Sequence, residues 1–431
     1  MRLSIRPVPP CTVTPTSHVP FWCCTITQPA RLNKKRLSME TQAPWNWERM
    51  LNPYPFTPTA PVRLSKMWME YQGIKNWEGL LDPLDDTLRG EIIRYGQFIE
   101  AAYQSFDFNP SSPSYATCRY PKSSLLERSG FPMTGYRVTK NLHATSSIQL
   151  PRWIEKAPSW VGTQSSWIGH VAVCQDKDEI ARLGRRDMVI AYRGTATCLE
   201  WLENLRASLT QLPCGPMVES GFLSLYTSRT PTCPSLQDLV REEFWRLLQS
   251  YGGDDHDDQP VPLSLTITGH SLGAALAILT AYDIKKTFKH APLVTVISFG
   301  GPRVGNRCFR RDLEKQGTKI LRIVNSDDII TKVPGFVIDD NDTENNNDPD
   351  VHVANVLPGW IQKRVEDTQW VYADVGQELR LSSKDSPYLA GINVATCHEL
   401  KTYLHLVNGF VSSTCPYMHR ATVGTHSQIC T

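Results

Sequence analysis

The chain has 431 residues, of which 41% are hydrophobic and 20% are charged, and its formal net charge at pH 7 is +2. This length and composition are typical of a globular protein with one large domain and appended segments. The small net charge gives no reason to expect a nucleic-acid partner, and no apolar stretch reaches the roughly eighteen residues that a transmembrane helix needs. We therefore expect a protein that is soluble or binds membranes peripherally.

Metal binding is not indicated by the sequence. The 12 cysteines are scattered without a CxxC pair, which argues against a zinc site. The acidic run Asp339–Asp350 does not fit an EF-hand, because a loop begun at Asp340 has Asn345 where calcium loops need Gly and Val351 where they need Glu. We expect a solvated loop there, and neither a metal nor another cofactor in the protein.

The first residues differ in composition from the rest of the chain. Met1–Met39 contains no Asp or Glu, carries several Lys and Arg, and is rich in Ser, Thr and Pro. Such a segment is typical of an organelle transit peptide, and its prolines oppose both the apolar core of a secretory signal and the amphipathic helix of a mitochondrial one. We predict a plastid transit peptide and disordered entry over residues 1–44. An unstructured cytosolic tail or a mispredicted gene start is the competing interpretation.

A long helix is predicted in the segment that follows. Between Leu88 and Phe106 apolar residues recur at helical spacing, and Asp85 or Asp86 can cap the helix start. Because one side of this helix is apolar, it should pack on a hydrophobic core. We assign residues 45–130 to an N-terminal helical and loop segment that packs on the domain after it.

The next part of the chain alternates between β-rich runs and helical patterns. Strand followed by helix, repeated along the chain, predicts a mostly parallel sheet covered on both faces, with the functional loops at the carboxyl ends of the strands. No internal repeat of fixed period is visible. The predicted strands lie in Tyr136–Pro151, Ser166–Asp176, Arg185–Thr197, Leu263–Thr268, Leu293–Asn306 and Thr318–Pro334.

One strand leads into the sequence "GHSLG", Gly269 to Gly273, and the helical stretch Ala274–Ile284 follows it. A lone serine between two glycines where a strand gives way to a helix is the pattern of a nucleophile elbow. We predict that Ser271 has a strained backbone and an exposed hydroxyl above the sheet, whereas an ordinary turn is the alternative. Residues 131–410 are thus predicted to form an α/β domain of the α/β-hydrolase fold, with a mostly parallel sheet.

A serine nucleophile needs a base and an acid that orients the base. In this fold the chain order is Ser, then Asp or Glu, then His, so Asp327 and Asp328 at a strand end are the acid candidates. Among the later histidines we favour His398, which starts a helix-like run on the loop side, and we expect His405 to have a packing or capping role. The histidines after the serine are His352, His398, His405, His419 and His426.

The developing oxyanion needs hydrogen-bond donors as well. One is the backbone amide of the residue after the serine, Leu272, and another comes from a loop after an earlier strand. The loop after Met188–Tyr192 is suitable, because Gly194 permits close approach and Thr195 offers both an amide and a hydroxyl. An ordinary turn hydroxyl is the competing interpretation of Thr195.

Six segments together resemble a known family. They are "NWEGLLDPLDDTLRGEIIRYGQF", "AYRGTATCLEWLENL", "ESGFLSLY", "GHSLGAALAILTAYDI", "VISFGGPRVGN" and "CHELKTYLHLVNGF". The chain resembles the class 3 lipases over about residues 68–410, and within them the plant phospholipase A1 acylhydrolases of the chloroplastic class I, anther-dehiscence type. The helix entry "NWEGLLDPLD" and the tryptophan-bearing "RGT" loop are not generic to hydrolases.

The resemblance implies roles for particular residues and an activity. Ser271 corresponds to the nucleophile, Asp328 to the acid, His398 to the base, and Thr195 with Leu272 to the oxyanion hole. The implied reaction is hydrolysis of the sn-1 acyl ester of membrane phospholipids or galactolipids, with release of a free fatty acid. A triacylglycerol lipase and a non-catalytic lipase-like signalling scaffold are the alternatives.

The resemblance also implies a lid and a location. Cys198–Pro213 resembles the lipase lid, with Leu199, Trp201, Leu202 and Leu205 suited to meet a lipid surface, although an amphipathic helix that covers the core would have the same pattern. We expect peripheral contact with a lipid interface. The expected location is the chloroplast, either the stroma or the plastoglobule or thylakoid surface.

Two features depart from the family pattern. The sequence from Val411 resembles nothing in the family, so residues 411–431 are expected to be a divergent tail of a truncated or misspliced chain. Thr331 stands near the acid where relatives often have Pro.

Overall fold

The structure is a computed structural model of the chain. It describes residues 63–109, 111–132, 134–145, 165–195, 208–213, 215–231, 233–252, 261–333, 372–389 and 394–415. The predicted transit segment 1–44, the acidic run 339–350 and residues 416–431 lie outside these ranges.

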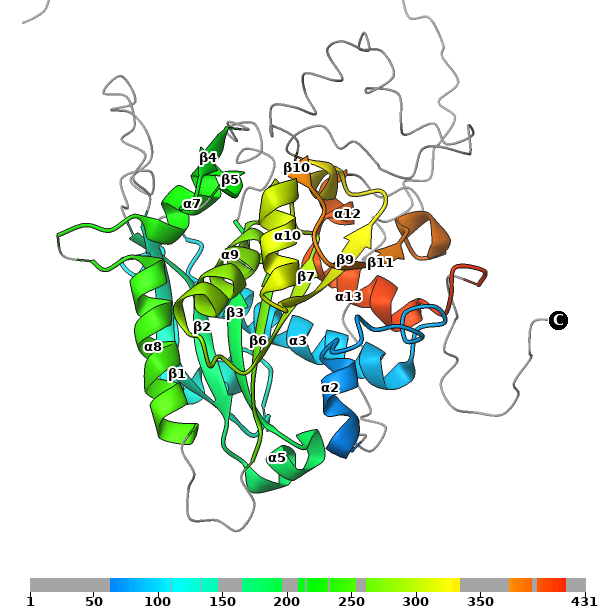
Figure 1. Cartoon of the computed structure of the whole chain (residues 1–431), viewed down its shortest axis with the longest axis horizontal. Coiled ribbons are helices and arrows are strands. Elements are labelled where there is room, and N and C mark those ends of the chain that lie inside the picture. Colours follow the sequence, from blue (N-terminus) through cyan, green and yellow to red (C-terminus); the bar gives the residue numbers. More distant parts are fainter. Residues whose placement is uncertain are drawn as a thin grey trace, which may run out of the picture. The chain divides into compact units, whose positions relative to one another are not determined.

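A seven-stranded sheet runs through the described residues, in the order β1-β2-β3-β6-β7-β9-β11 (Figure 1). The strands from β3 to β11 are parallel, and β1 and β2 add to one edge in antiparallel fashion. The predicted mostly parallel sheet is therefore present. Its strands are β1 (Tyr136–Thr145), β2 (Ser165–Cys174), β3 (Arg186–Tyr192), β6 (Leu263–His270), β7 (Leu293–Phe299), β9 (Lys319–Asn325) and β11 (Gln377–Leu381).

Helices cover both faces of this sheet, as expected for parallel strands, which must be buried on both sides. Each face has its own cluster of buried apolar side chains. The first cluster includes side chains of α7 (Ser220–Thr227), α8 (Leu236–Tyr251), α9 (Leu272–Thr287) and α10 (Arg307–Lys315). The second includes side chains of α3 (Asp86–Ser105), α4 (Leu125–Arg128) and α13 (Leu400–Gly409).

The remaining described elements are short. A small antiparallel sheet has the order β10-β8-β5-β4. Its strands are β4 (Leu209–Gln211), β5 (Met217–Glu219), β8 (Gly305–Asn306) and β10 (Tyr372–Ala373). The short helices are α2 (Trp68–Tyr71), α5 (Lys177–Leu183) and α12 (Val394–Cys397), and the 3₁₀ helices are η1 (Ser65–Met67), η2 (Lys122–Ser124), η5 (Ile329–Lys332) and η8 (Ser383–Asp385).

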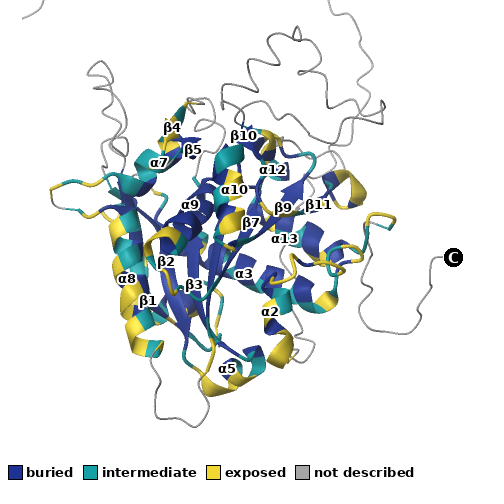
Figure 2. Ribbon diagram, viewed as in Figure 1, coloured by how far each residue is buried: buried dark blue, intermediate teal, exposed yellow. Residues whose placement is uncertain are grey.

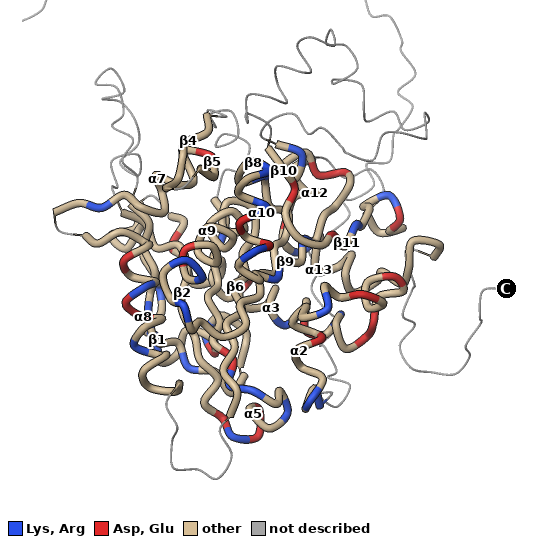
Figure 3. The backbone as a smooth tube through the Cα atoms, viewed as in Figure 1, with Lys and Arg blue, Asp and Glu red and all other residues tan. Residues whose placement is uncertain are grey.

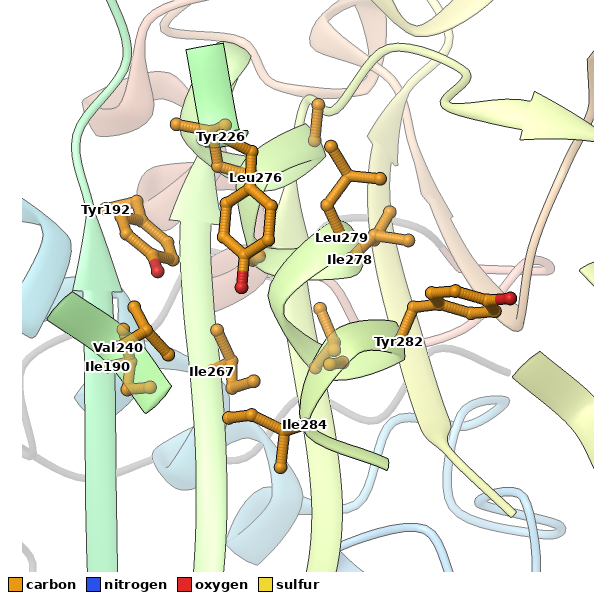
Figure 4. Packing of buried hydrophobic residues seen from close by; sticks show 14 of the residues in the cluster. Ile190, Tyr192, Tyr226, Val240, Ile267, Leu276, Ile278, Leu279, Tyr282 and Ile284 are labelled. Carbon is orange, nitrogen blue, oxygen red and sulfur yellow. The ribbon is translucent and has the colours of Figure 1, made fainter. Parts of the chain in front are cut away.

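The helix α9, which begins directly after the serine turn, is deeply buried. Every residue from Leu272 to Ile284 is buried, and the dark blue of the central strands and of α9 in Figure 2 shows the same. A helix that is apolar all round belongs inside a core. Its alanines let it lie close to the sheet, and Figure 4 shows Ile284 of α9 beside Ile267 of β6.

The predicted long helix is present as α3, and its start has the predicted cap. The side chain of Asp85 accepts hydrogen bonds from the amides of Thr87 and Leu88, each at 2.9 Å. Such a cap stabilises a helix by about 1 kcal/mol. The face of α3 that carries Ile92 and Phe98 is fully buried against the sheet.

Exposed charged residues of both signs lie along the outer helices, whereas some charged residues such as Asp187 and Asp328 are buried. Figure 3 shows Lys and Arg interspersed with Asp and Glu along α5 and α8, so that neither helix presents charges of a single sign. Within the part of the chain that the structure describes, no helix combines the length and the apolar character that a bilayer span requires.

Candidate active site

Ser271 lies in the sharp turn between β6 and α9, as predicted. Its φ is 57° and its ψ is −126°, a backbone conformation that residues with a side chain rarely adopt. The flanking glycines are required sterically, because a Cβ on Gly269 would lie 2.2 Å from the carbonyl oxygen of Gly273, and one on Gly273 would lie 2.6 Å from that of Arg193. The turn thus has the geometry of a nucleophile elbow.

The expected exposure of the serine is wrong. Ser271 is only 1% exposed. The loop after β3 closes in on it from one side, since a Cβ added to Gly194 would lie 3.0 Å from the Cβ of Ser271. An elbow raises the serine above its sheet, but loops from neighbouring strands can still cover it, and a sequence pattern does not show them.

Asp328 and His398 come together from distant parts of the chain. Asp328 follows β9, His398 lies between α12 and α13, and His398 Nδ1 is 2.6 Å from Asp328 Oδ2. Asp328 is 0% and His398 6% exposed, so the pair is shielded from water. Asp327 instead accepts hydrogen bonds from the side chain of Ser382 and the amide of Ser383. Of the two acid candidates, Asp328 is therefore the one that contacts the histidine.

The contacts of Asp328 define how the histidine is protonated. Its Oδ1 accepts from the amide of Ile330 at 2.9 Å, and its Oδ2 accepts from the hydroxyl of Tyr403 at 2.6 Å. A carboxylate only accepts, so His398 carries its proton on Nδ1 and leaves Nε2 able to receive one. Burial, together with the charge of Asp328, raises the pKa of Tyr403 well above 10, so this hydroxyl stays a donor.

Thr331, which lies near the acid, also supports this loop. It is buried, and its hydroxyl donates to the backbone carbonyl of Asp328 at 2.9 Å. Thr331 therefore closes the turn that carries the carboxylate with a hydrogen bond of its own. A proline at this position would have no hydroxyl to make this bond.

The donors predicted for an oxyanion also lie at this edge of the sheet. Leu272 is the first residue of α9, and the leading amides of a helix have no partner within that helix. Thr195 follows β3, and its hydroxyl oxygen is buried with no hydrogen-bond partner among the described residues. A buried hydroxyl is normally paired, so this oxygen is suited to a group that enters the site.

Several other expectations fall outside the described residues. Leu199, Trp201, Leu202 and Leu205, proposed for the lid, are among them, as are His352, His419 and His426. Of the Cys198–Pro213 segment, residues 208–213 are described. There Leu209 is half-buried in β4, and Leu212 packs against the first core cluster.

Two tyrosines of the candidate site are not indicated by the sequence pattern. Tyr403 supports Asp328, and the hydroxyl of Tyr103 lies 2.8 Å from Nδ1 of His270. Both tyrosines lie on amphipathic helices, where a sequence pattern counts them as core. His405, by contrast, was expected to be structural, and its Nε2 is 2.9 Å from the hydroxyl of Ser386.

A metal site is absent from the described part of the chain, in the sense that no group of three or more His, Cys, Asp and Glu side chains is placed to hold an ion.

The fold and the elbow define a member of the α/β-hydrolase class. A family model described as Lipase (class 3) matches residues 189–338. The chain is 61% identical to the chloroplastic phospholipase A(1) DAD1 of Arabidopsis thaliana, over 92% of this chain and 90% of that protein. It therefore belongs to the plant phospholipase A1 family of class 3 lipases.

Two further similarities were found. The chain is 39% identical to the chloroplastic galactolipase DONGLE of Arabidopsis thaliana, over 81% of this chain and 72% of that one. Among solved structures, the native complex of Rhizomucor miehei lipase with its propeptide is 16% identical over 69% of each chain, with a TM-score of 0.40.

Proposed function

We propose that this protein is a serine acylhydrolase that cleaves the sn-1 acyl ester of membrane glycerolipids, either phospholipids or galactolipids, and releases a free fatty acid. The observation that carries this proposal is the 2.6 Å contact of Asp328 with His398 at the sheet edge where Ser271 holds its strained elbow conformation. The names of the relatives, a phospholipase A(1) and a galactolipase, supply the substrate class.

The proposed reaction uses these groups in sequence. His398 Nε2 takes the proton of the Ser271 hydroxyl while the serine oxygen attacks the ester carbonyl. Asp328 keeps the ring oriented and stabilises its charge, and the amide of Leu272 with the amide or hydroxyl of Thr195 binds the oxyanion. His398 then protonates the departing lysolipid alcohol, and water attacks the acyl-serine with the same histidine as base.

The burial of the serine supports action at a lipid interface. Because Ser271 is 1% exposed, we expect part of the surrounding chain to move when an acyl ester reaches it. A lipid surface favours such a movement when it receives the apolar surface that is uncovered. We therefore expect peripheral contact with the membrane that supplies the substrate, and higher activity on micelles or vesicles than on the same ester as dispersed monomers.

The proposed location is the chloroplast. The acid-free basic composition of the first residues supports it, and so do the names of the relatives, which are chloroplastic. Within the organelle, the stroma with the thylakoid or plastoglobule surface is the place where a peripheral enzyme would meet galactolipids.

Parallel assays of the purified full chain test the function. Phosphatidylcholine, monogalactosyldiacylglycerol and triacylglycerol would be presented in the same detergent micelles, and the released fatty acid and the position of cleavage measured. We expect sn-1 cleavage of at least one of the two membrane lipids. Ser271→Ala should lower kcat by about 10⁴-fold or more, without loss of the cooperative unfolding transition.

The alternatives predict different results. Cleavage of triacylglycerol alone would identify a neutral lipase. A folded protein that cleaves none of the three lipids, and whose Ser271→Ala variant is indistinguishable from it, would favour the scaffold.

A further inference from the structure

His270, the residue just before the nucleophile, connects two loops of the candidate site. It is 4% exposed, and its Nε2 lies 2.7 Å from the backbone carbonyl oxygen of His398. Its Nδ1 lies 2.8 Å from the hydroxyl of Tyr103, which in turn is 2.8 Å from the amide nitrogen of Gly194. We call this series, from Gly194 through Tyr103 and His270 to His398, the tyrosine–histidine bridge.

The chemistry of these groups allows one arrangement of protons for a neutral ring. The carbonyl oxygen of His398 only accepts, so His270 carries its proton on Nε2. Its Nδ1 is then an acceptor, and the hydroxyl of Tyr103 must donate to it. The tyrosine oxygen keeps lone pairs, and the amide of Gly194 donates to one of them. Every group in the bridge is thus satisfied.

Both ends of the bridge belong to reacting groups. Gly194 precedes Thr195, the proposed oxyanion donor, and the carbonyl at the other end belongs to His398, the proposed base. The contact at Gly194 depends on glycine, because a Cβ there would lie 2.5 Å from the hydroxyl of Tyr103. Since Ser271 follows His270 directly, the bridge connects oxyanion loop, nucleophile and base.

From this geometry we infer that Tyr103 and His270 are positioning residues, which hold the Gly194–Thr195 loop and the main chain of His398 at the spacing that transfer of the acyl group requires. The inference rests on the proposed ester hydrolysis. Neither side chain exchanges a proton with substrate. Their effect on the rate comes through the placement of other groups, and a displacement of about 1 Å in a catalytic group can cost roughly a hundredfold in rate.

The environment keeps the bridge in this protonation state. Burial, with a contribution from the neighbouring ring of His398, lowers the pKa of His270 well below 6.5. The two rings are 4.8 Å apart between centroids. When His398 takes a proton from the serine, His270 therefore remains neutral and its bond to the carbonyl persists.

Removing one hydroxyl tests the bridge with little change in shape. Tyr103→Phe deprives the amide of Gly194 of its acceptor and Nδ1 of His270 of its donor. We expect kcat on micellar phosphatidylcholine to fall about tenfold to a hundredfold, with KM changed less than about threefold. The matched control is Tyr192→Phe, which also removes a buried tyrosine hydroxyl, one that lies 2.9 Å from the hydroxyl of Thr280. It should lower thermal stability to a similar extent and leave kcat unchanged.

Two substitutions of His270 each keep one of its two hydrogen bonds, either to His398 or to Tyr103. In His270→Gln the amide nitrogen can replace Nε2 and still donate to the carbonyl of His398, whereas in His270→Asn the amide oxygen can replace Nδ1 and still accept from Tyr103. Because the glutamine variant has already lost the hydrogen bond between Nδ1 and Tyr103, adding Tyr103→Phe to it removes only the contact with the amide of Gly194 and should cost less activity than in the wild type. Added to His405→Gln, whose histidine contacts Ser386, the same change should cost as much as in the wild type.

The outcomes are distinct. If the wild type hydrolyses a lipid and Ser271→Ala abolishes that activity, the proposed function stands. An unchanged kcat in Tyr103→Phe would then overturn the inferred role of the bridge. Effects of Tyr103→Phe and His270→Gln that multiply as independent changes would also overturn it. If the wild type hydrolyses none of the lipids, the proposed function fails and the bridge fails with it.

Discussion

Two buried polar clusters lie at opposite ends of β3 and β6, and they are built differently. At the amino end, Asp187 of β3 accepts hydrogen bonds from four hydroxyl groups. At the carboxyl end, the chain leaves the same two strands into the loops that hold Ser271 and Thr195. Both clusters are buried and both contain charge. The four donors to Asp187 are Tyr95, Tyr136, Ser264 and Thr266.

The amino-end cluster has its charges paired. Arg185 and Arg94 lie 3.9 Å and 3.7 Å from Asp187, and Arg94 is also 2.6 Å from Glu91. Burial would raise the pKa of Glu91, but Arg94 and Arg185 overcome that effect and hold it below 4.5. With every group partnered and no backbone strain at Asp187 or Arg185, the cluster is suited to stability rather than chemistry.

The carboxyl-end cluster is incomplete and strained. Ser271 has a positive φ, and the hydroxyl of Thr195 has no hydrogen-bond partner among the described residues. Strain and a buried polar atom without a partner both cost stability, and they persist where a function requires them. Burial and charge are common to both clusters, whereas the strain at Ser271 together with the unused hydrogen-bonding capacity of Thr195 sets the carboxyl-end cluster apart from the one around Asp187.

Among the tests of this contrast, replacing the acid Asp328 should have the largest effect, and that effect is on kcat. Asp328→Asn places an amide group where His398 and Tyr403 both need an acceptor, so we expect kcat to fall about 10³- to 10⁴-fold while the unfolding free energy changes little. Steady-state hydrolysis and guanidinium unfolding measure the two quantities. Asp327→Asn is the matched control and should change kcat by less than about threefold. Equal losses in the two variants would remove the distinction between the neighbouring carboxylates.

At the amino end of the strands, a substitution should lower stability and leave kcat unchanged. Asp187→Ala leaves Arg185 without one of its two buried carboxylate neighbours, so the unfolding free energy should fall by about 3 to 5 kcal/mol. The kcat per folded molecule should stay the same. Asp86→Ala, which removes an exposed partner of Arg89, should cost about 1 kcal/mol or less. A large loss of kcat in folded Asp187→Ala would show that the two ends are coupled.

The smallest expected effect concerns a buried group with neither charge partners nor strain. His170 of β2 is 0% exposed, and neither ring nitrogen has a hydrogen-bond partner among the described residues. Burial lowers its pKa from 6.5 to about 4. Between those values the unfolded chain binds a proton that the folded protein excludes, so stability falls as the pH drops from about 6.5 to about 4, by up to roughly 3 kcal/mol.

A variant isolates this contribution from those of other histidines. His170→Phe should make the unfolding free energy less dependent on pH across that window, as measured by guanidinium unfolding at several pH values. An identical pH dependence in the variant and the wild type would show that His170 is not the group that titrates. Hydrolysis at pH 7.5 should not distinguish the two proteins, because His170 lies outside the candidate site.

The elements around the site were predictable because their signals are local. The two glycines around Ser271 indicated the elbow, and the spacing of apolar residues with Asp85 as cap indicated α3. The residues alone left Asp327 and Asp328 open, since adjacent carboxylates in a turn point in different directions. The resemblance favoured Asp328, and the structure places it against His398.

The sequence by itself determined six of the seven strands of the main sheet, the helices α3 and α9, the sharp turn at Ser271 and the family, because steric limits, periodicity and motifs act over a few residues. Only the tertiary structure decided which carboxylate meets the imidazole, that loops cover Ser271, and that Tyr103 joins His270. Tyr103 and His270 are separated by 167 positions along the chain, and no local rule relates them. Their contact arises from the packing of α3 against the sheet, which depends on the whole buried core at once.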